Sequence, residues 1–139
     1  MNGRVCVIGA GSSGIAAAQV LHARGIPFDC FEIGSEVGGN WRYQNDNGMS
    51  SAYRSVHINT SRERMEFSDF PMPKSYPDFP RHDHSARYFD DYVDHFGFRD
   101  RISFRTEVVK VEPEGSAYAV TVRGRMTGVG TDPGRFCLA

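Results

Sequence analysis

The stretch that decides the fold is Gly9-Ala10-Gly11-Ser12-Ser13-Gly14, which joins the apolar run Val5-Cys6-Val7-Ile8 to an alanine-rich run at residues 15–23. In a tight turn from a strand into a helix, the first glycine permits the sharp bend and the second lets a diphosphate approach the bare backbone. The third lets helix and strand pack closely. Unpaired N–H groups and the positive end of the helix dipole favour an anion there. The turn therefore predicts an α/β fold with a phosphate-binding site.

The context of the turn decides between a ligand site and a plain glycine-rich bend. The helix is expected to stop at Gly25, and Pro27 precedes an alternating run, Phe28-Asp29-Cys30-Phe31, that predicts a second strand. Glu32 follows at roughly the twenty-residue spacing at which an acid meets the adenosine ribose of a dinucleotide. Strand, helix, strand and acid together favour a dinucleotide, and the charge of Glu32 argues against a 2′-phosphate at this site.

The composition is that of one soluble domain, with 139 residues and a net charge of −1. It gives no indication of nucleic acid or an anionic membrane as a partner. Glycines and serines interrupt the apolar stretch after Arg4, so it does not read as a signal peptide, and no apolar run is long enough to span a bilayer. Cys6, Cys30 and Cys137 lack metal-ligand spacing and are predicted to be buried thiols, which fits a cytoplasmic protein.

A glycine doublet and an aromatic residue follow the second strand, at Gly38-Gly39-Asn40-Trp41, where a plain NAD domain would continue into another crossover helix. The doublet allows the backbone to approach an extended ligand without interference from side chains. Trp41 can cover a flat ring or fill the core, and the residue type alone favours neither.

The remaining chain predicts further elements of a doubly wound sheet. The proline-rich residues 70–80 cannot form a helix and are expected to be a surface loop whose aromatic residues pack onto the domain: Phe70, Tyr76 and Phe79. A helix over 86–96, ending at Gly97, leads to a third parallel strand at 101–104. Residues 107–112 and 117–123 predict a hairpin. Residues 1–123 then form an incomplete domain, and 124–139 a glycine-rich tail without strand periodicity, expected to be disordered.

The histidines before that helix do not indicate a metal site. His82 and His84 flank Asp83, but no third ligand stands at a familiar spacing, so we interpret both as solvated loop residues. Asp83 or Ser85 is expected to cap the helix. We therefore assign no metal to this chain.

Two stretches are more specific than the glycine turn: YRSVHINTSR at residues 53–62 and MEFSDFPMP at residues 65–73. Together with the turn, Glu32 and the Gly38-Gly39-Asn40-Trp41 stretch, they resemble the flavin-containing monooxygenases over roughly residues 4–123. The resemblance implies a Rossmann-like FAD-binding domain, with a parallel sheet, crossover helices and a hairpin from a meander. It also implies that the chain is the N-terminal part of such an enzyme.

The resemblance assigns the cofactor-binding residues. Gly9 to Ser13 would hold the FAD pyrophosphate, and Gly14 completes this cofactor-binding turn. Glu32 would bind the adenosine ribose, and Val108 would offer backbone atoms to the adenine. Gly39, Asn40 and Trp41 would lie along the flavin side of the cofactor.

Asn59 and Thr60 would lie beside the isoalloxazine ring, and Asn59, the candidate catalytic residue, would also contact the nicotinamide cofactor and support the oxygenated flavin. The residue type fits, because an uncharged amide donates and accepts hydrogen bonds without acting as an acid. Without the resemblance, Asn59-Thr60-Ser61 indicates a helix cap ahead of Arg62. The two roles can coexist on neighbouring residues.

The implied activity is an NADPH- and O2-dependent oxygenation of a sulfur or amine nitrogen in a small molecule, through a hydroperoxyflavin. We expect no turnover by these 139 residues alone, because the family's second glycine turn, which binds NADPH, is not among them. Two alternatives stay open. One is a truncated flavin-binding fragment without catalysis, and the other is an NAD-binding dehydrogenase domain, which the glycine doublet disfavours.

Overall fold

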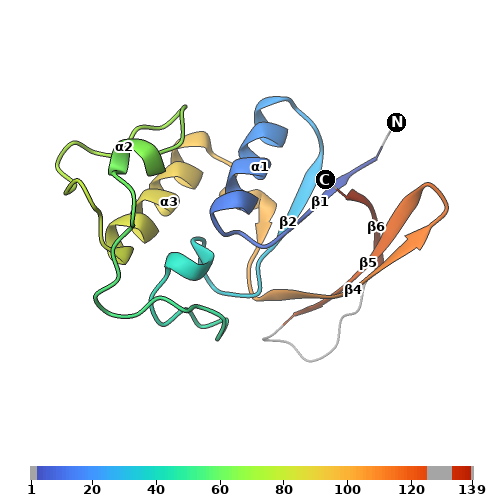
Figure 1. Ribbon diagram of the computed structural model, residues 1–139. Coiled ribbons are helices and arrows are strands. Elements are labelled where there is room, and N and C mark those ends of the chain that lie inside the picture. Colours follow the sequence, from blue (N-terminus) through green and yellow to red (C-terminus); the bar gives the residue numbers. More distant parts are fainter. Residues whose placement is uncertain (1–2, 125–132, 139) are drawn as a thin grey trace.

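The computed structural model describes residues 3–124 and 133–138. Three short parallel strands lie at its centre: β1 (Val5–Ile8), β2 (Phe28–Phe31) and β3 (Ile102–Ser103). Helices α1 (Ser12–Ala23) and α3 (His82–Phe96) cover one face of these strands, and a meander lies on the other side (Figure 1). The predicted parallel sheet with crossover helices is confirmed.

Other elements cover both faces of the central strands, and β1 is accordingly apolar throughout. Val7 of β1 and Phe28 of β2 belong to the larger core beneath the helices. Cys6 and Phe31, on the opposite face, pack with Val120 of the meander in a second, smaller core. The central sheet is therefore the middle layer of three.

The meander consists of β4 (Thr106–Glu114), β5 (Ala117–Gly124) and β6 (Pro133–Leu138). Strands β4 and β5 form the predicted hairpin, with Glu114 opposite Ala117. Strand β6 pairs antiparallel with β5, and it also pairs parallel with β1, where Val5 lies opposite Cys137. The meander is thereby joined to the central strands in the order β3-β2-β1-β6-β5-β4.

Strand β6 corrects the expectation that residues 124–139 lack regular structure. The six residues Pro133–Leu138 are too short to show a strand periodicity, but they find a partner strand on both sides, and this pairing decides their conformation. Residues 125–132 and 139, which fall within the same expected tail, lie outside the described residues.

Helix α3 begins four residues earlier than predicted, so Asp83 and Ser85 lie inside it and Arg81 is its N-cap residue. The first turn is held by two contacts that sequence periodicity does not reveal. The Arg81 guanidinium pairs with the Asp83 carboxylate at 2.6 and 2.9 Å, and the His82 N–H donates to the Val56 carbonyl at 3.1 Å. The predicted stop at Gly97 is confirmed, since this residue has a φ of +72°.

The proline-rich loop packs on α3 through hydrogen bonds as well as aromatic contacts. The Tyr88 hydroxyl accepts from the Phe67 N–H at 2.7 Å and donates to the Phe70 carbonyl at 2.5 Å. Arg62, which begins the short helix α2 (Arg62–Met65), donates to the Tyr76 carbonyl at 2.6 Å. The loop therefore packs onto the domain as expected, except at Phe79, which is 54% exposed.

Two short 3-10 helices complete the described structure: η1 (Gly39–Trp41) and η2 (Arg99–Arg101). Helix η2 includes Arg101, the first residue of the strand expected at 101–104, so β3 begins only at Ile102.

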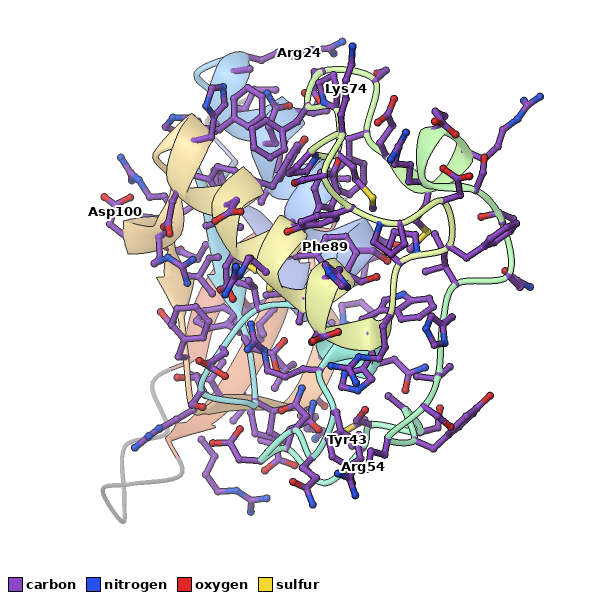
Figure 2. All side chains as sticks on the ribbon, turned by 90° about the vertical axis from the view of Figure 1, so that its left-hand side faces the viewer. Arg24, Tyr43, Arg54, Lys74, Phe89 and Asp100 are labelled. Atoms are coloured by element: carbon purple, nitrogen blue, oxygen red, sulfur yellow. The ribbon has the colours of Figure 1, made fainter. Side chains whose placement is uncertain are left out.

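Figure 2 looks onto α3 and shows Phe89 midway along it, with Tyr43 and Arg54 towards one end of the molecule and Lys74 towards the other.

The buried Tyr88 predicts a loss of stability at high pH. Burial raises its pKa from 10.0 to about 12, so the folded chain retains a proton that the unfolded chain releases in this interval. The contribution of protonated Tyr88 to the free energy of unfolding is complete below pH 10 and is lost as the pH rises towards 12. The free energy of unfolding, measured by urea denaturation, should fall more steeply across this window in the wild type than in Tyr88→Phe. Exposed Tyr53→Phe is the control and should keep the wild-type slope; equal slopes for all three chains would contradict the prediction.

Candidate functional site

The turn between β1 and α1 has the geometry that its glycines predict. Gly9 adopts a φ of +91°, which bends the chain sharply at the end of β1. Gly11 is the N-cap residue of α1, and no side chain caps the helix there. Since the first N–H groups of an α-helix have no partner within the helix, they are available to an anion.

Gly14 shows why α1 can pass so close to the strand. A Cβ built on Gly14 would lie 1.9 Å from the carbonyl oxygen of Gly9 and 2.9 Å from its carbonyl carbon. Both are backbone atoms, which cannot rotate away. The third glycine of the turn is therefore required by packing.

The glycine doublet lies directly against this turn. The Gly38 N–H donates to the Ala10 carbonyl at 2.9 Å, and a Cβ built on Gly39 would lie 3.0 Å from the Cα of Gly11. The two glycine segments border an open cavity of about 290 Å³. Its lining consists of Ile8, Gly9, Gly11, Ser12, Ser13, Gly14, Gly38, Asn40 and Trp41.

Asn40 and Trp41 form the far wall of this cavity in different ways. The exposed Asn40 accepts hydrogen bonds through Oδ1 from the N–H and hydroxyl of Ser51, at 2.7 and 2.9 Å, and so holds the following loop. Trp41 is half-buried, packs against the larger core and also lines the cavity. Trp41 can therefore fill the core and cover a flat ring in the cavity at the same time.

Glu32 is 3% exposed and connects several elements around the turn. Its Oε2 accepts from the Ala10 N–H and its Oε1 from the Gly34 N–H, both at 2.7 Å. A Cβ built on Gly34 would lie 2.9 Å from Asn45 Oδ1 and 3.1 Å from Glu32 Oε1, so a side chain at position 34 would displace these groups. Sequence reasoning missed this structural role, although Gly34 two residues after the acid is a signal for a close approach.

A second cavity, of about 340 Å³, adjoins the first, because Ile8 and Gly9 line both. Its other lining residues are Phe31, Ile33, Met49, Thr106, Glu107 and Val108. The pairing of β4 with β5 shifts register between Val108 and Lys110, which places a bulge beside the cavity. The site therefore extends from the glycine turn to the start of the meander, with Val108 in its wall.

Asn59 and Thr60 stand apart from these cavities. Both are exposed, they precede α2, and neither lines either cavity. Ser61 is the N-cap residue of α2, so the interpretation of residues 59–61 as a helix start is correct at its last residue, although no side chain caps the backbone there. The flavin roles of Asn59 and Thr60 stay predictions.

His82 corrects the interpretation of the two histidines as solvated loop residues. It is the first residue of α3, it is 8% exposed, and its Nε2 lies 3.1 Å from the Arg54 carbonyl oxygen. Its ring also contacts that of Tyr43, with centroids 5.2 Å apart. In the described part of the chain, no group of three or more His, Cys, Asp or Glu side chains is placed to hold a metal ion.

The thiols of Cys6 and Cys30 are free and buried, as predicted. Burial is the main cause that raises their pKa values to about 11 and about 12, so neither is a reactive thiolate at neutral pH. The side chain of Cys137 lies outside the described residues. Within residues 3–124 and 133–138, no helix has the length and apolar character needed to cross a bilayer.

The fold and the glycine-lined cavities define a nucleotide-binding α/β domain of the kind found in flavoproteins. Comparison with known proteins narrows this class: a family model described as flavin-binding monooxygenase-like matches residues 2–127. The chain belongs to this family.

Individual relatives support the same family. The chain is 41% identical over 111 residues to flavin-containing monooxygenase 5 of Cavia porcellus, and 42% identical over 117 residues to its counterpart in Rattus norvegicus. These matches cover 78% and 81% of this chain, and 21% and 22% of the relatives. The solved S-allyl-L-cysteine S-oxygenase of Allium sativum has a TM-score of 0.86 at 30% identity, over 98% of this chain and 35% of that one. The chain thus spans about a fifth of the length of the curated relatives it matches.

The contact between Gly14 and Gly9 predicts a large cost for a methyl group at this position. Gly14→Ala should lower the free energy of unfolding by about 3 kcal/mol, because the helix must move off the strand. Gly25→Ala is a matched control, since Gly25 has a φ of +64° but no atom within 4 Å of a built Cβ, and it should cost only about 1 kcal/mol. Denaturant titration measures both; equal costs would show that α1 is not held against Gly9.

The hydrogen bonds of Glu32 predict a stability effect in the absence of any ligand. In Glu32→Gln one of the two N–H donors faces an amide nitrogen, so the free energy of unfolding should fall by about 1–3 kcal/mol. Amide hydrogen exchange at Ala10 and Gly34 should become faster. Glu112→Gln, which breaks only an exposed pair with Lys110, should change stability by less than about 0.5 kcal/mol. Unchanged exchange at Ala10 and Gly34 in Glu32→Gln would contradict this role.

Proposed function

We propose that this chain is the FAD-binding part of a flavin-dependent monooxygenase that uses NADPH and O2 to oxygenate a sulfur or nitrogen atom of a small molecule. The observation that carries the proposal is the pair of adjoining cavities that meet at Ile8 and Gly9. One offers helix N–H groups for a diphosphate, and the other offers an apolar wall for a flat ring. We prefer FAD to other dinucleotides because the chain belongs to the flavin-binding monooxygenase-like family.

The adenosine half of FAD fits the second cavity. Its ring would lie against Ile33, Val108 and Met49, whose side chain is 72% exposed and therefore accessible to a ligand. The ribose would approach Glu32, whose carboxylate oxygens each keep a further lone pair beyond the N–H that they already accept. In this proposal Glu32 shapes the turn and binds the sugar at the same time.

The diphosphate would lie over Gly11, where a bare backbone leaves the cavity open. Ser12 and Ser13 begin α1, so their N–H groups would face a bound anion at the positive end of the helix dipole. The flavin half would then pass Asn40 and Trp41, the far wall of the first cavity. Trp41 would exclude water from one side of the cofactor.

When bound and reduced by NADPH, the flavin supplies the oxygen chemistry, and the protein has to position and shelter it. Asn59 and Thr60 are proposed to contact the isoalloxazine ring. Both are exposed on the segment that leads into α2. A neutral amide at Asn59 could hold a hydrogen bond there without donating a proton as an acid. The expected substrate is a small molecule, and the expected compartment is the cytoplasm.

Gly11→Ala separates ligand binding from folding. A Cβ on Gly11 would meet only the Cα of Gly39, at an ordinary 3.8 Å, so the free energy of unfolding should stay within about 1 kcal/mol of the wild type. The same methyl group occupies the space proposed for the diphosphate, so the dissociation constant for FAD should rise by about tenfold or more. Flavin fluorescence titration measures the affinity, and denaturant titration measures the stability.

The outcomes also separate the alternatives. Wild-type protein that binds NADH but not FAD would identify a dehydrogenase domain and overturn the proposal. Retention of FAD by the wild-type protein would, in contrast, contradict the dehydrogenase alternative. Equal FAD affinity of wild type and Gly11→Ala would place the diphosphate elsewhere.

A further inference from the structure

Arg42 follows the cavity-lining turn Gly38–Trp41 and holds three groups at once. Its Nε donates to the Val37 carbonyl at 2.8 Å, and its two terminal nitrogens pair with Glu36 at 2.9 Å and with Asp90 at 2.5 Å. The side chain is only 18% exposed. The contacts with Val37 and Glu36 lie within one loop, residues 36–42, and the contact with Asp90 connects this loop to α3.

Asp90 is a well-supported anchor for Arg42. Its Oδ2 accepts from Arg42, and its Oδ1 accepts from Arg99 at 3.1 Å. Arg99 in turn pairs with Asp94 at 2.5 Å, one helical turn further along α3. The neighbouring Phe89 is 1% exposed and fixes this part of the helix in the larger core. Charge pairing at Asp90 therefore connects the loop from Glu36 to Arg42 to a helix that packs in the larger core.

Besides Arg42, the Asn45 amide holds the turn between Val37 and Arg42, by donating from Nδ2 to the Gly39 carbonyl at 3.0 Å. Gly38 and Gly39 have φ values of +114° and +51° and carry no side chains that could pack. A single backbone hydrogen bond, from Gly38 to Ala10, joins this turn to the glycine turn across the cavity. A Cβ built on Gly38 would lie 3.8 Å from both Arg42 Nε and Phe89 Cδ2, so the backbone at Gly38 rests against this anchor.

We propose that Arg42 and Asp90 are positioning residues that clamp the Gly38–Trp41 turn to α3 and thereby set the distance between the two walls of the cavity. The effect on the turn is a property of the chain without ligand. The consequence for FAD affinity rests on the function proposed above.

The clamp requires arginine and not merely a positive charge. A guanidinium is planar and donates in three directions, towards a carbonyl and two carboxylates, whereas a lysine ammonium cannot span all three. Arg42→Lys thus keeps the charge but releases part of the loop. Asp90→Asn keeps the shape of the anchor but removes its charge. Asp94→Asn is the matched control, because Asp94 lies on the same helix and pairs with Arg99 but not with Arg42.

The only tryptophan of the chain, Trp41, lies in the turn and reports on it directly. Quenching of its fluorescence by acrylamide, in the full chain without FAD, should increase by about twofold in Arg42→Lys and Asp90→Asn, because a released turn exposes the ring to solvent. Asp94→Asn should match the wild type. Wild-type quenching in both Arg42→Lys and Asp90→Asn would overturn the proposal.

FAD affinity provides the second measurement. Both clamp variants should raise the dissociation constant by roughly fivefold, and the double variant should be no weaker than the weaker single one, because each residue acts through the other. Asp94→Asn should bind as the wild type does. Multiplicative losses in the double variant would overturn the coupling. If the wild type binds no FAD, the proposed function fails, while Trp41 quenching still decides the clamp. Should Asp90→Asn not fold, Arg42→Lys decides alone.

Discussion

The close approach of α1 to β1, backbone against backbone at Gly14 and Gly9, is the constraint on which the rest of the structure depends. Because no side chain separates them, the helix begins immediately above the end of the strand and its first N–H groups open towards the cavity. The other elements are arranged around this point. Glu32 reaches back to Ala10, Gly38 donates to the carbonyl of the same residue, and Ile8 and Gly9 belong to both cavities.

The parts of the fold predictable from the sequence are those in which a local pattern has a local cause. The glycine turn follows from backbone sterics, the end of α3 follows from Gly97, and the hairpin follows from alternation on both sides of a turn. Strand β6 could not be predicted in this way. Its conformation comes from partner strands on both sides, which belong to distant parts of the chain.

The site shows the same division. The sequence places the glycines, Asn40, Trp41 and Val108, and the structure gathers them around two adjoining cavities. The sequence could not reveal that the Glu32 carboxylate accepts hydrogen bonds from two backbone N–H groups. Nor could it reveal that Arg42 pairs with a carboxylate 48 positions later, that of Asp90. Such contacts depend on elements that meet only in the folded chain. Burial of His82 depends likewise on the Arg54 carbonyl, far from it in sequence.

The position of β6 has a consequence for how the domain assembles. The glycine turn and the doublet are contained in the first 41 residues, but β1 gains the neighbour on its other side only from residues 133–138. Contacts of such long sequence separation form slowly, because the intervening chain must first be ordered. During synthesis, the phosphate-facing half of the site can therefore take shape early. The half that borders the meander has to wait until residues 133–138 have left the ribosome.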